Sequence, residues 1–241
     1  MTDLAQPHPP PAATGAVDEE LLAGLRAGRA DAFAQLMRRY NRMLFRAARG
    51  IVGDDAEAQD AVQEGYLRAF VALDGYRGES SLGTWLTRIV INQALGQQRK
   101  LGRVVFLDET LPDDEEGAMS EHSPGRADGI DPATPEATAS NNELRRQLEA
   151  AIDLLPPIYR CVFILRAVEG MSVEDTAGNL RVSLDVVKTR YLRARAMLRR
   201  HLDAGATVPL SALHDFRGAR CDDMVVQVLA RLRAAGVVRD Q

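Results

Sequence analysis

A long acidic segment divides this chain into two basic blocks. The segment spans residues 108–140 and holds few large apolar residues, no helical period, the run Asp113–Glu116 and several prolines, among them Pro112, Pro124 and Pro132. Such a composition buries too little apolar surface to fold by itself, and structureless loops of this length are uncommon inside compact domains. We therefore expect a flexible acidic linker between two helical domains. A long surface loop within one domain is the alternative.

The charge is segregated along the chain in the same way. The formal net charge is −4 and the pI is about 5.7. Residues 25–100 nevertheless hold 12 basic and 8 acidic side chains, and residues 141–200 hold 11 and 7, whereas residues 101–140 hold 2 and 10. The whole-chain value therefore conceals two basic blocks on either side of an acidic one.

Apolar residues in the rest of the chain recur at intervals of three and four, which is the period of an amphipathic helix. Aromatic residues make up only 5% of the chain, so a core must consist mainly of Leu, Val, Ile and Ala, which favours helix over sheet. The spacing predicts helices over residues 18–29, 31 to about 52, about 56–73, about 81–100, 141–154, 158–168, 173–180, about 184–202 and 221–238.

The predicted fold class is all-α, with two small helical domains and a C-terminal helical extension. The expected divisions are a disordered N-terminus (1–17), a first helical domain (18–100), the acidic linker (101–140), a helix-turn-helix domain (141–202) and the extension (203–241).

The sequence also excludes several classes of protein. No apolar run approaches the roughly 20 residues that a membrane helix needs. Residues 1–17 lack the basic start and apolar core of a signal peptide. Two cysteines cannot make a disulfide framework. We therefore expect a cytoplasmic protein with no membrane insertion.

Candidate catalytic and metal-binding residues are sparse. The four histidines are scattered and do not converge with a nucleophile or a base, so we expect no enzyme. His214 and Cys221 are too few to hold a metal ion, and Cys161 lies in an apolar helix where we expect it in the core. We predict neither a metal nor a cofactor.

The second basic block contains a helix-turn-helix pattern. A short helix (173–180), a tight turn (181–183) and a long helix (184–202) follow one another, and residues 181–200 hold seven basic side chains against one acidic. The early part of the second helix of this motif enters the major groove of DNA. The side chains that project there are Lys188, Thr189, Leu192 and Arg193, whereas Arg190 and Arg195 suit phosphates. A basic surface helix with no groove to enter is the alternative.

The first basic block has two helices with polar faces. On the helix over 56–73, Asp60, Gln63 and Glu64 lie opposite the apolar face, and from the charges alone they would be a solvated surface. On the helix over 81–100, Arg88, Asn92 and Arg99 recur at intervals of four and seven.

This block also contains the motifs Ala58–Glu64, Phe70, Tyr76–Ser81, Thr84–Leu86, and Ile89 with Asn92. Together they resemble region two of the extracytoplasmic-function (ECF) sigma factors of bacterial RNA polymerase. In that family the helix with the acid-Gln-Glu pattern docks on the clamp helices of the polymerase β′ subunit. The resemblance assigns this role to Asp60, Gln63 and Glu64, whose carboxylate and amide groups can pair with arginines of a partner helix.

The same resemblance implies contact with the minus-ten promoter element. In the family, the loop before the fourth helix receives a base flipped out of the melted strand. The residues that would form the pocket and the single-stranded DNA path are Gly78, Glu79, Ser80, Ser81, Arg88, Asn92, Arg99 and Lys100. Trp85 is expected in the core because of its apolar spacing, with a stacking platform as the alternative.

The second block resembles region four of the same family in its motifs Leu155–Pro156, Tyr159–Arg160, Val162–Phe163, Glu169–Ser172, Val182–Ser183, Val187–Arg190 and Arg193–Arg195. That region reads the minus-thirty-five promoter element and meets the flap of the polymerase β subunit. The resemblance assigns the reading of DNA to Ser183, Lys188, Thr189, Arg190, Leu192 and Arg193.

The sequence thus predicts an alternative sigma factor, responsive to stress or another signal, that directs transcription initiation and helps to melt promoters. Its expected partners are RNA polymerase core, promoter DNA and an anti-sigma factor, and it would be nucleoid-associated when bound to polymerase. We further expect the acidic run of the linker to mimic nucleic acid in a basic polymerase channel.

Two questions stay open at this level. A stand-alone helix-turn-helix regulator is the rival, although it would need neither the acid-Gln-Glu helix nor the loop before Trp85. The extension after residue 203 has one amphipathic helix whose apolar face could dock on region four, on core polymerase or on an anti-sigma factor.

Overall fold

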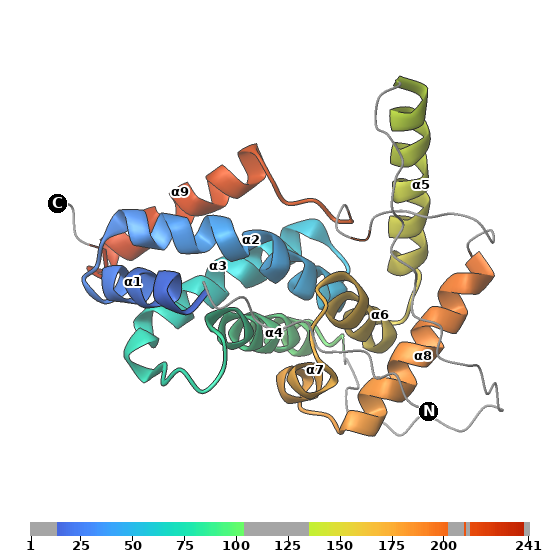
Figure 1. The fold of residues 1–241 in the computed structure, drawn as a ribbon, viewed down its shortest axis with the longest axis horizontal. Coiled ribbons are helices and arrows are strands. Elements are labelled where there is room, and N and C mark those ends of the chain that lie inside the picture. The colour runs from blue at the N-terminus through green and yellow to red at the C-terminus, as the bar shows by residue number, and fades with distance from the viewer. Residues whose placement is uncertain (1–13, 104–134, 202–209, 211–212, 239–241) are drawn as a thin grey trace.

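The computed structural model describes residues 14–103, 135–201, 210 and 213–238, and within these residues the regular elements are helices (Figure 1). The all-α prediction is confirmed. The α-helices are α1 (Thr14–Arg26), α2 (Ala30–Val52), α3 (Asp55–Val71), α4 (Leu82–Lys100), α5 (Pro135–Asp153), α6 (Pro157–Phe163), α7 (Val173–Leu180), α8 (Leu184–His201) and α9 (Ala219–Ala234). A 3-10 turn (Leu73–Gly75) follows α3, and a π-helical turn (Ile164–Val168) continues α6.

Some predicted divisions shift and others fall outside the described residues. Helix α1 starts at Thr14, inside the predicted disordered N-terminus, and α5 starts at Pro135, inside the predicted linker. Residues 1–13 and the acidic run Asp113–Glu116 lie outside the described residues. No helix in the described ranges combines the length and apolar character needed to cross a bilayer.

Local sequence signals set the helix boundaries. Helix α2 ends at Gly53, whose φ of 79° is the left-handed conformation that glycine adopts freely. The side chain of Asp54 then caps α3 by accepting the amides of residues 56 and 57 at 2.9 and 3.0 Å. Ser81 and Ser172 cap α4 and α7 with their hydroxyls, which accept the amides of Thr84 and Asp175.

Helices α2, α3 and α4 pack together as the first helical unit, with α1 against α2. Phe70 of α3 meets Phe33 of α2 edge-on, with ring centroids 4.6 Å apart, and stacks on Tyr66 at 5.5 Å. Gly65 lets α3 approach α4 closely, because a Cβ at this position would lie 2.5 Å from Cγ2 of Val90. The result is a rigid base for the loop between α3 and α4.

The second helical unit, made of α5, α6, α7 and α8, packs directly on the first. Helix α6 crosses α2 and α7 lies against α4 (Figure 1). At the crossing, a Cβ on Gly50 would lie 3.2 Å from the Cα of Cys161, so the two backbones nearly touch. Cys161, Val162 and Leu165 share one buried cluster with α2, α3 and α4. Residues of both helical units therefore contribute to a common core.

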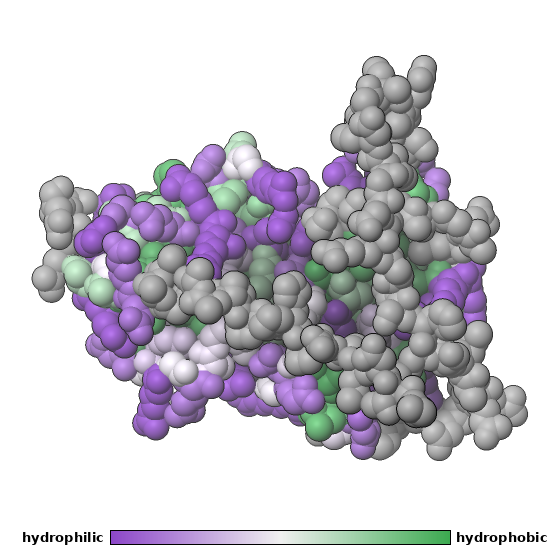
Figure 2. All heavy atoms as spheres, in the orientation of Figure 1, coloured by the Kyte–Doolittle hydropathy of each residue, from purple (hydrophilic) through white to green (hydrophobic). Residues whose placement is uncertain are grey.

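Helix α9 also packs on the first unit. It lies along α2 and α3 in Figure 1 and buries its apolar face in the same cluster. In Figure 2 the coloured surface over α2 and α9 is mostly hydrophilic, since the apolar side chains of both helices are turned inward.

Candidate functional site

The loop between α3 and α4 forms an open pocket. The pocket has a volume of about 410 Å³ and is lined by residues 75–80 together with Trp85 and Arg88 of α4. Tyr76 shapes it from below: its hydroxyl donates to the carbonyl of Ser80 at 2.8 Å, and its ring lies 5.2 Å from that of Trp85. The structure thus brings together Gly78, Glu79, Ser80 and Arg88, as the sequence predicted, at one concave surface.

The residues of this loop differ in how accessible they are to a ligand. Gly78 has a φ of 75° and open space where a Cβ would be, so its backbone is accessible. Glu79 and Arg88 are exposed. The Ser81 hydroxyl is occupied by the cap of α4, where it accepts the amide of Thr84 at 3.1 Å. Trp85 is half-buried on the pocket wall, so it is neither a fully buried core residue nor a free platform.

The rest of the predicted minus-ten path follows α4 away from the pocket. Asn92 is half-buried, and Arg99 and Lys100 are exposed in the last turn. Arg88 lies beside α7, because a Cβ on Gly178 would be 3.4 Å from its guanidinium. Single-stranded nucleic acid that follows α4 from the pocket would therefore pass along the edge of α7.

Helices α7 and α8 have the geometry of a helix-turn-helix. Ser172 caps α7, and α7 ends at Arg181, a non-glycine residue in the left-handed conformation with φ 56°. Ser183 accepts the amide of Val186 at 3.3 Å at the start of α8. The turn between the helices is therefore short, and the Ser183 side chain caps its α8 end.

Most predicted recognition residues of α8 face solvent. Lys188 and Thr189 are exposed, Leu192 is 50% exposed although it is apolar, and Arg193 is half-buried. Arg190 differs, since it is only 3% exposed. It points inward near Cys161, where its charge opposes the burial that raises the pKa of that thiol to about 11. In this arrangement Arg190 does not reach a phosphate, whereas its neighbours on the outer face can.

The acid-Gln-Glu face of α3 meets α9. Asp60 is exposed, and Gln63 and Glu64 are half-buried. Gln63 donates to the side chain of Gln227 at 2.6 Å, and Glu64 accepts from Arg231 at 2.5 Å. The three predicted docking residues are thus on one face of α3, but two of them contact the C-terminal helix.

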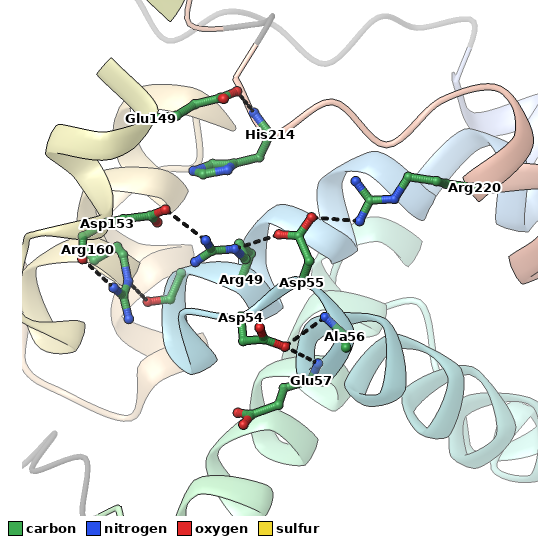
Figure 3. Close-up of polar contacts among 11 residues, drawn as sticks. Arg49, Asp54, Asp55, Ala56, Glu57, Glu149, Asp153, Arg160, His214 and Arg220 are labelled. Atoms are coloured by element: carbon green, nitrogen blue, oxygen red, sulfur yellow. Dashed lines mark hydrogen bonds and ion pairs between the residues drawn. The ribbon is translucent and has the colours of Figure 1, made fainter. Parts of the chain in front are cut away.

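A polar network that the sequence did not predict joins the two units (Figure 3). Arg49 of α2 bridges Asp55 and Asp153, with 2.8 Å to each carboxylate. Arg160 of α6 donates to the carbonyls of Gly50 and Asp153 at 3.0 Å. Burial acts to raise the pKa of Asp55, but its hydrogen bonds with Arg49 and Arg220 hold that pKa below the ordinary value.

Arg46 adds a second connection, deeper in the interface. Its guanidinium is 2% exposed, donates to the carbonyl of Leu213 at 2.6 Å and pairs with Glu169 at 3.0 Å. The only signal in the sequence is that Arg46 and Arg49 interrupt an otherwise apolar helical stretch over residues 44–52.

The described residues contain no cluster of three metal-ligating side chains. Burial, with a contribution from Arg49, holds the pKa of His214 below its ordinary value, while nearby carboxylates oppose that shift. Cys221 accepts a hydrogen bond from Asn41 instead of joining His214 in a site.

Comparison with known families agrees with this geometry. The family model for sigma-70 region 2 matches residues 36–104, and that for sigma-70 region 4 matches residues 145–198. The ECF RNA polymerase sigma factor SigW of Bacillus subtilis is 30% identical over 178 residues, which are 74% of this chain and 92% of SigW. The chain belongs to the ECF sigma factors. As a sigma factor, it acts in transcription initiation.

Two further comparisons describe this sigma factor's relatives. The ECF RNA polymerase sigma factor SigE of Mycolicibacterium smegmatis is 33% identical over 168 residues, which are 70% of this chain but only 60% of SigE. Among solved structures, that of CnrH in complex with the cytosolic domain of CnrY superposes with a TM-score of 0.51 at 28% identity, covering 78% of this chain and 99% of that chain.

Proposed function

We propose that this sigma factor reads promoters with two separate surfaces and binds polymerase core with a third. The observation that carries the proposal is the pocket between α3 and α4, where an accessible glycine, a carboxylate, a cation and an aromatic ring surround one cavity. These are the groups that a flipped base needs, since a base is held by hydrogen bonds to its edge and by stacking. Gly78, Glu79, Ser80 and Trp85 would receive the base of the minus-ten element.

The phosphates of the melted strand would follow α4. Arg88, Arg99 and Lys100 supply cations along this helix, and Asn92 supplies an amide between them. Ser81 supports the path indirectly, by fixing the start of α4. This arrangement favours one strand leaving the pocket along the helix.

The minus-thirty-five element would meet the outer face of α8. Lys188 and Arg193 can donate hydrogen bonds to guanine edges or to phosphates, and the Thr189 hydroxyl can hydrogen-bond with a base edge. The exposed Leu192 side chain can contact a thymine methyl group. Ser183 stands at the start of this helix, where its hydroxyl caps the first turn. Arg190 is buried near Cys161 and does not belong to this outer face.

The clamp helices of the polymerase β′ subunit would dock on α3 through Asp60, Gln63 and Glu64. The flap of the polymerase β subunit would contact region four. Carboxylates and an amide on one helix face are suited to arginines of another protein. CnrH was solved with the cytosolic domain of CnrY. By analogy we propose that an anti-sigma protein restrains this sigma factor until a stress or another signal arises. The factor would then act in the cytoplasm, at the nucleoid when it is bound to polymerase.

Promoter melting tests the pocket. In run-off transcription with purified polymerase core, we expect Glu79→Ala to lower open-complex formation about tenfold or more, because a hydrogen bond to a charged group is lost. Core binding should stay the same. The matched control is Asp74→Ala, an exposed acid just before the pocket.

The same assay separates the rival function. Duplex DNA binding by the chain alone, with neither core association nor promoter-dependent transcripts, would indicate a stand-alone helix-turn-helix regulator. Normal melting by Glu79→Ala would remove the pocket from the mechanism.

A further inference from the structure

Helix α9 covers the part of region two that contains the acid-Gln-Glu face. Its buried side chains, Met224, Val225, Val228, Leu229 and Leu232, lie in the same cluster as the cores of α2 and α3. Because the apolar stripe of α9 is fully used in this contact, the helix is a packed part of the molecule in this state.

The polar edge of α9 is matched to α3 residue by residue. Gln227 and Arg231 are four apart, so they stand one above the other on α9. Their partners Gln63 and Glu64 are consecutive residues of α3, and each contacts one of the two. The pair distances are 2.6 and 2.5 Å. An arginine and an amide of α9 therefore occupy the positions that a partner's arginine would use.

The start of α9 is anchored separately. Arg220 pairs with Asp55 at 2.9 Å and lies over the rings of Phe45 and Phe216, 4.9 and 5.0 Å from their centroids. Asn41 donates to the sulfur of Cys221 at 3.1 Å. These contacts hold the start of α9, so Cys221 becomes more accessible only when the whole helix leaves α2 and α3.

We propose that α9 is an internal competitor of polymerase core, which covers Gln63 and Glu64 in the free sigma factor and leaves them when core docks. The inference rests on the proposed docking function of α3. An α9 in this position, paired with Gln63 and Glu64, blocks a second helix from the same face of α3. The exposed ion pair of Arg231 is weak, so core that displaces α9 must offset mainly the loss of its buried apolar contacts.

The decisive variant is Arg231→Glu in the full chain. It places a carboxylate against Glu64, and Arg231 is 49% exposed, so folding should be unaffected. We expect the Kd for purified polymerase core to fall about three- to tenfold, because the competitor is weakened. The matched control is Asp223→Asn, a charge change at an exposed position of the same helix, which should leave the Kd unchanged.

Thiol labelling supplies an independent readout. Cys221 lies on α9 beside Asn41, and Cys161 is buried, with burial raising its pKa to about 11, so it reacts slowly. Mass spectrometry of the Cys221 peptide should show faster labelling when core is added, and faster labelling of free Arg231→Glu than of the free wild-type chain.

The variant Asp60→Arg tests docking of core on α3 separately from the competitor role of α9, since Asp60 is exposed on α3. If it binds core as tightly as wild type, the docking face is wrong and the competitor role falls with it. The competitor role alone is wrong if Asp60→Arg loses core binding, Arg231→Glu binds core with the wild-type Kd, and core does not speed the labelling of Cys221. In that case core docks on α3 and α9 is a permanent part of region two.

Discussion

Buried arginines hold the junction between region two and region four. Arg46 and Arg160 are 2% and 7% exposed, and each has carbonyl or carboxylate partners across the junction. A buried cation without such partners is strongly destabilising. In a sequence, an arginine in a helix looks the same whether it is solvated or buried, so the basic blocks predicted DNA contacts but not this junction. The same reason explains why Arg190 was assigned to phosphates.

We expect Cys161 to make the folding stability of the protein depend on pH in the alkaline range. Burial raises the pKa of its thiol from 9.0 to about 11. The unfolded chain therefore loses this proton at lower pH than the folded chain. Its contribution to stability is complete below pH 9, falls between pH 9 and 11, and does not change further above pH 11. The loss is about 2–3 kcal/mol in the free energy of unfolding.

Urea unfolding at several pH values measures this effect. The slope of the unfolding free energy between pH 9 and 11 should be smaller in Cys161→Ala than in wild type, whatever the cost of the cavity itself. Cys221→Ala is the control, since Cys221 is only half-buried. Equal slopes in wild type and Cys161→Ala would show that the thiol is not buried in solution.

At the scale of helices, two glycines make a matched pair. In Gly65→Ala the new methyl would lie 2.5 Å from Cγ2 and 3.3 Å from the Cα of Val90, so α3 and α4 must move apart. We expect a net loss of about 1–3 kcal/mol despite the better helix propensity of alanine. Gly96→Ala adds a methyl within α4 where no atom lies within 4 Å, and should gain about 0.5–1 kcal/mol.

Thermal and urea unfolding followed by circular dichroism measure both variants. A stabilising Gly65→Ala would mean that the contact between α3 and α4 is looser than the structure describes. Gly96 and Gly65 cannot be told apart by propensity, because only the packing of the helix against its neighbour separates them.

Most elements could be predicted because local signals bound them. The residues Gly53, Ser81 and Ser172 stop or cap helices through their own backbone or hydroxyl, and the predicted boundaries there are correct to within about two residues. The pocket between α3 and α4 was predictable for the same reason, since its lining residues are close in sequence. The helical segment that begins with α6 ends at Val168 as predicted, but its last turn, Ile164–Val168, is a π-helical turn that the periodicity did not predict.

At the scale of the whole molecule, the arrangement depends on surfaces far apart in the chain. The apolar face of α9 was visible in the sequence, but three docking partners remained open for it. The structure adds a fourth, region two itself. Periodicity shows that a helix has a buried face and carries no information on which surface covers it. The contact between Gly50 and Cys161 was equally hidden, because neither residue is unusual in an isolated helix.

The close packing of region four on region two can be tested at that contact. A leucine at position 50 cannot fit, since the Cα of Cys161 would lie 3.2 Å from its Cβ and α6 has no room to yield without leaving α2. Helix α2 itself gains from the change, because leucine is a better helix former than glycine. We therefore expect Gly50→Leu to separate the two regions without unfolding either.

Small-angle X-ray scattering should then show a larger radius of gyration with unchanged helical content by circular dichroism. Gly96→Leu, the same substitution in open space on α4, should leave the radius unchanged. An unchanged radius would mean that α6 adjusts locally and that region four stays packed on region two.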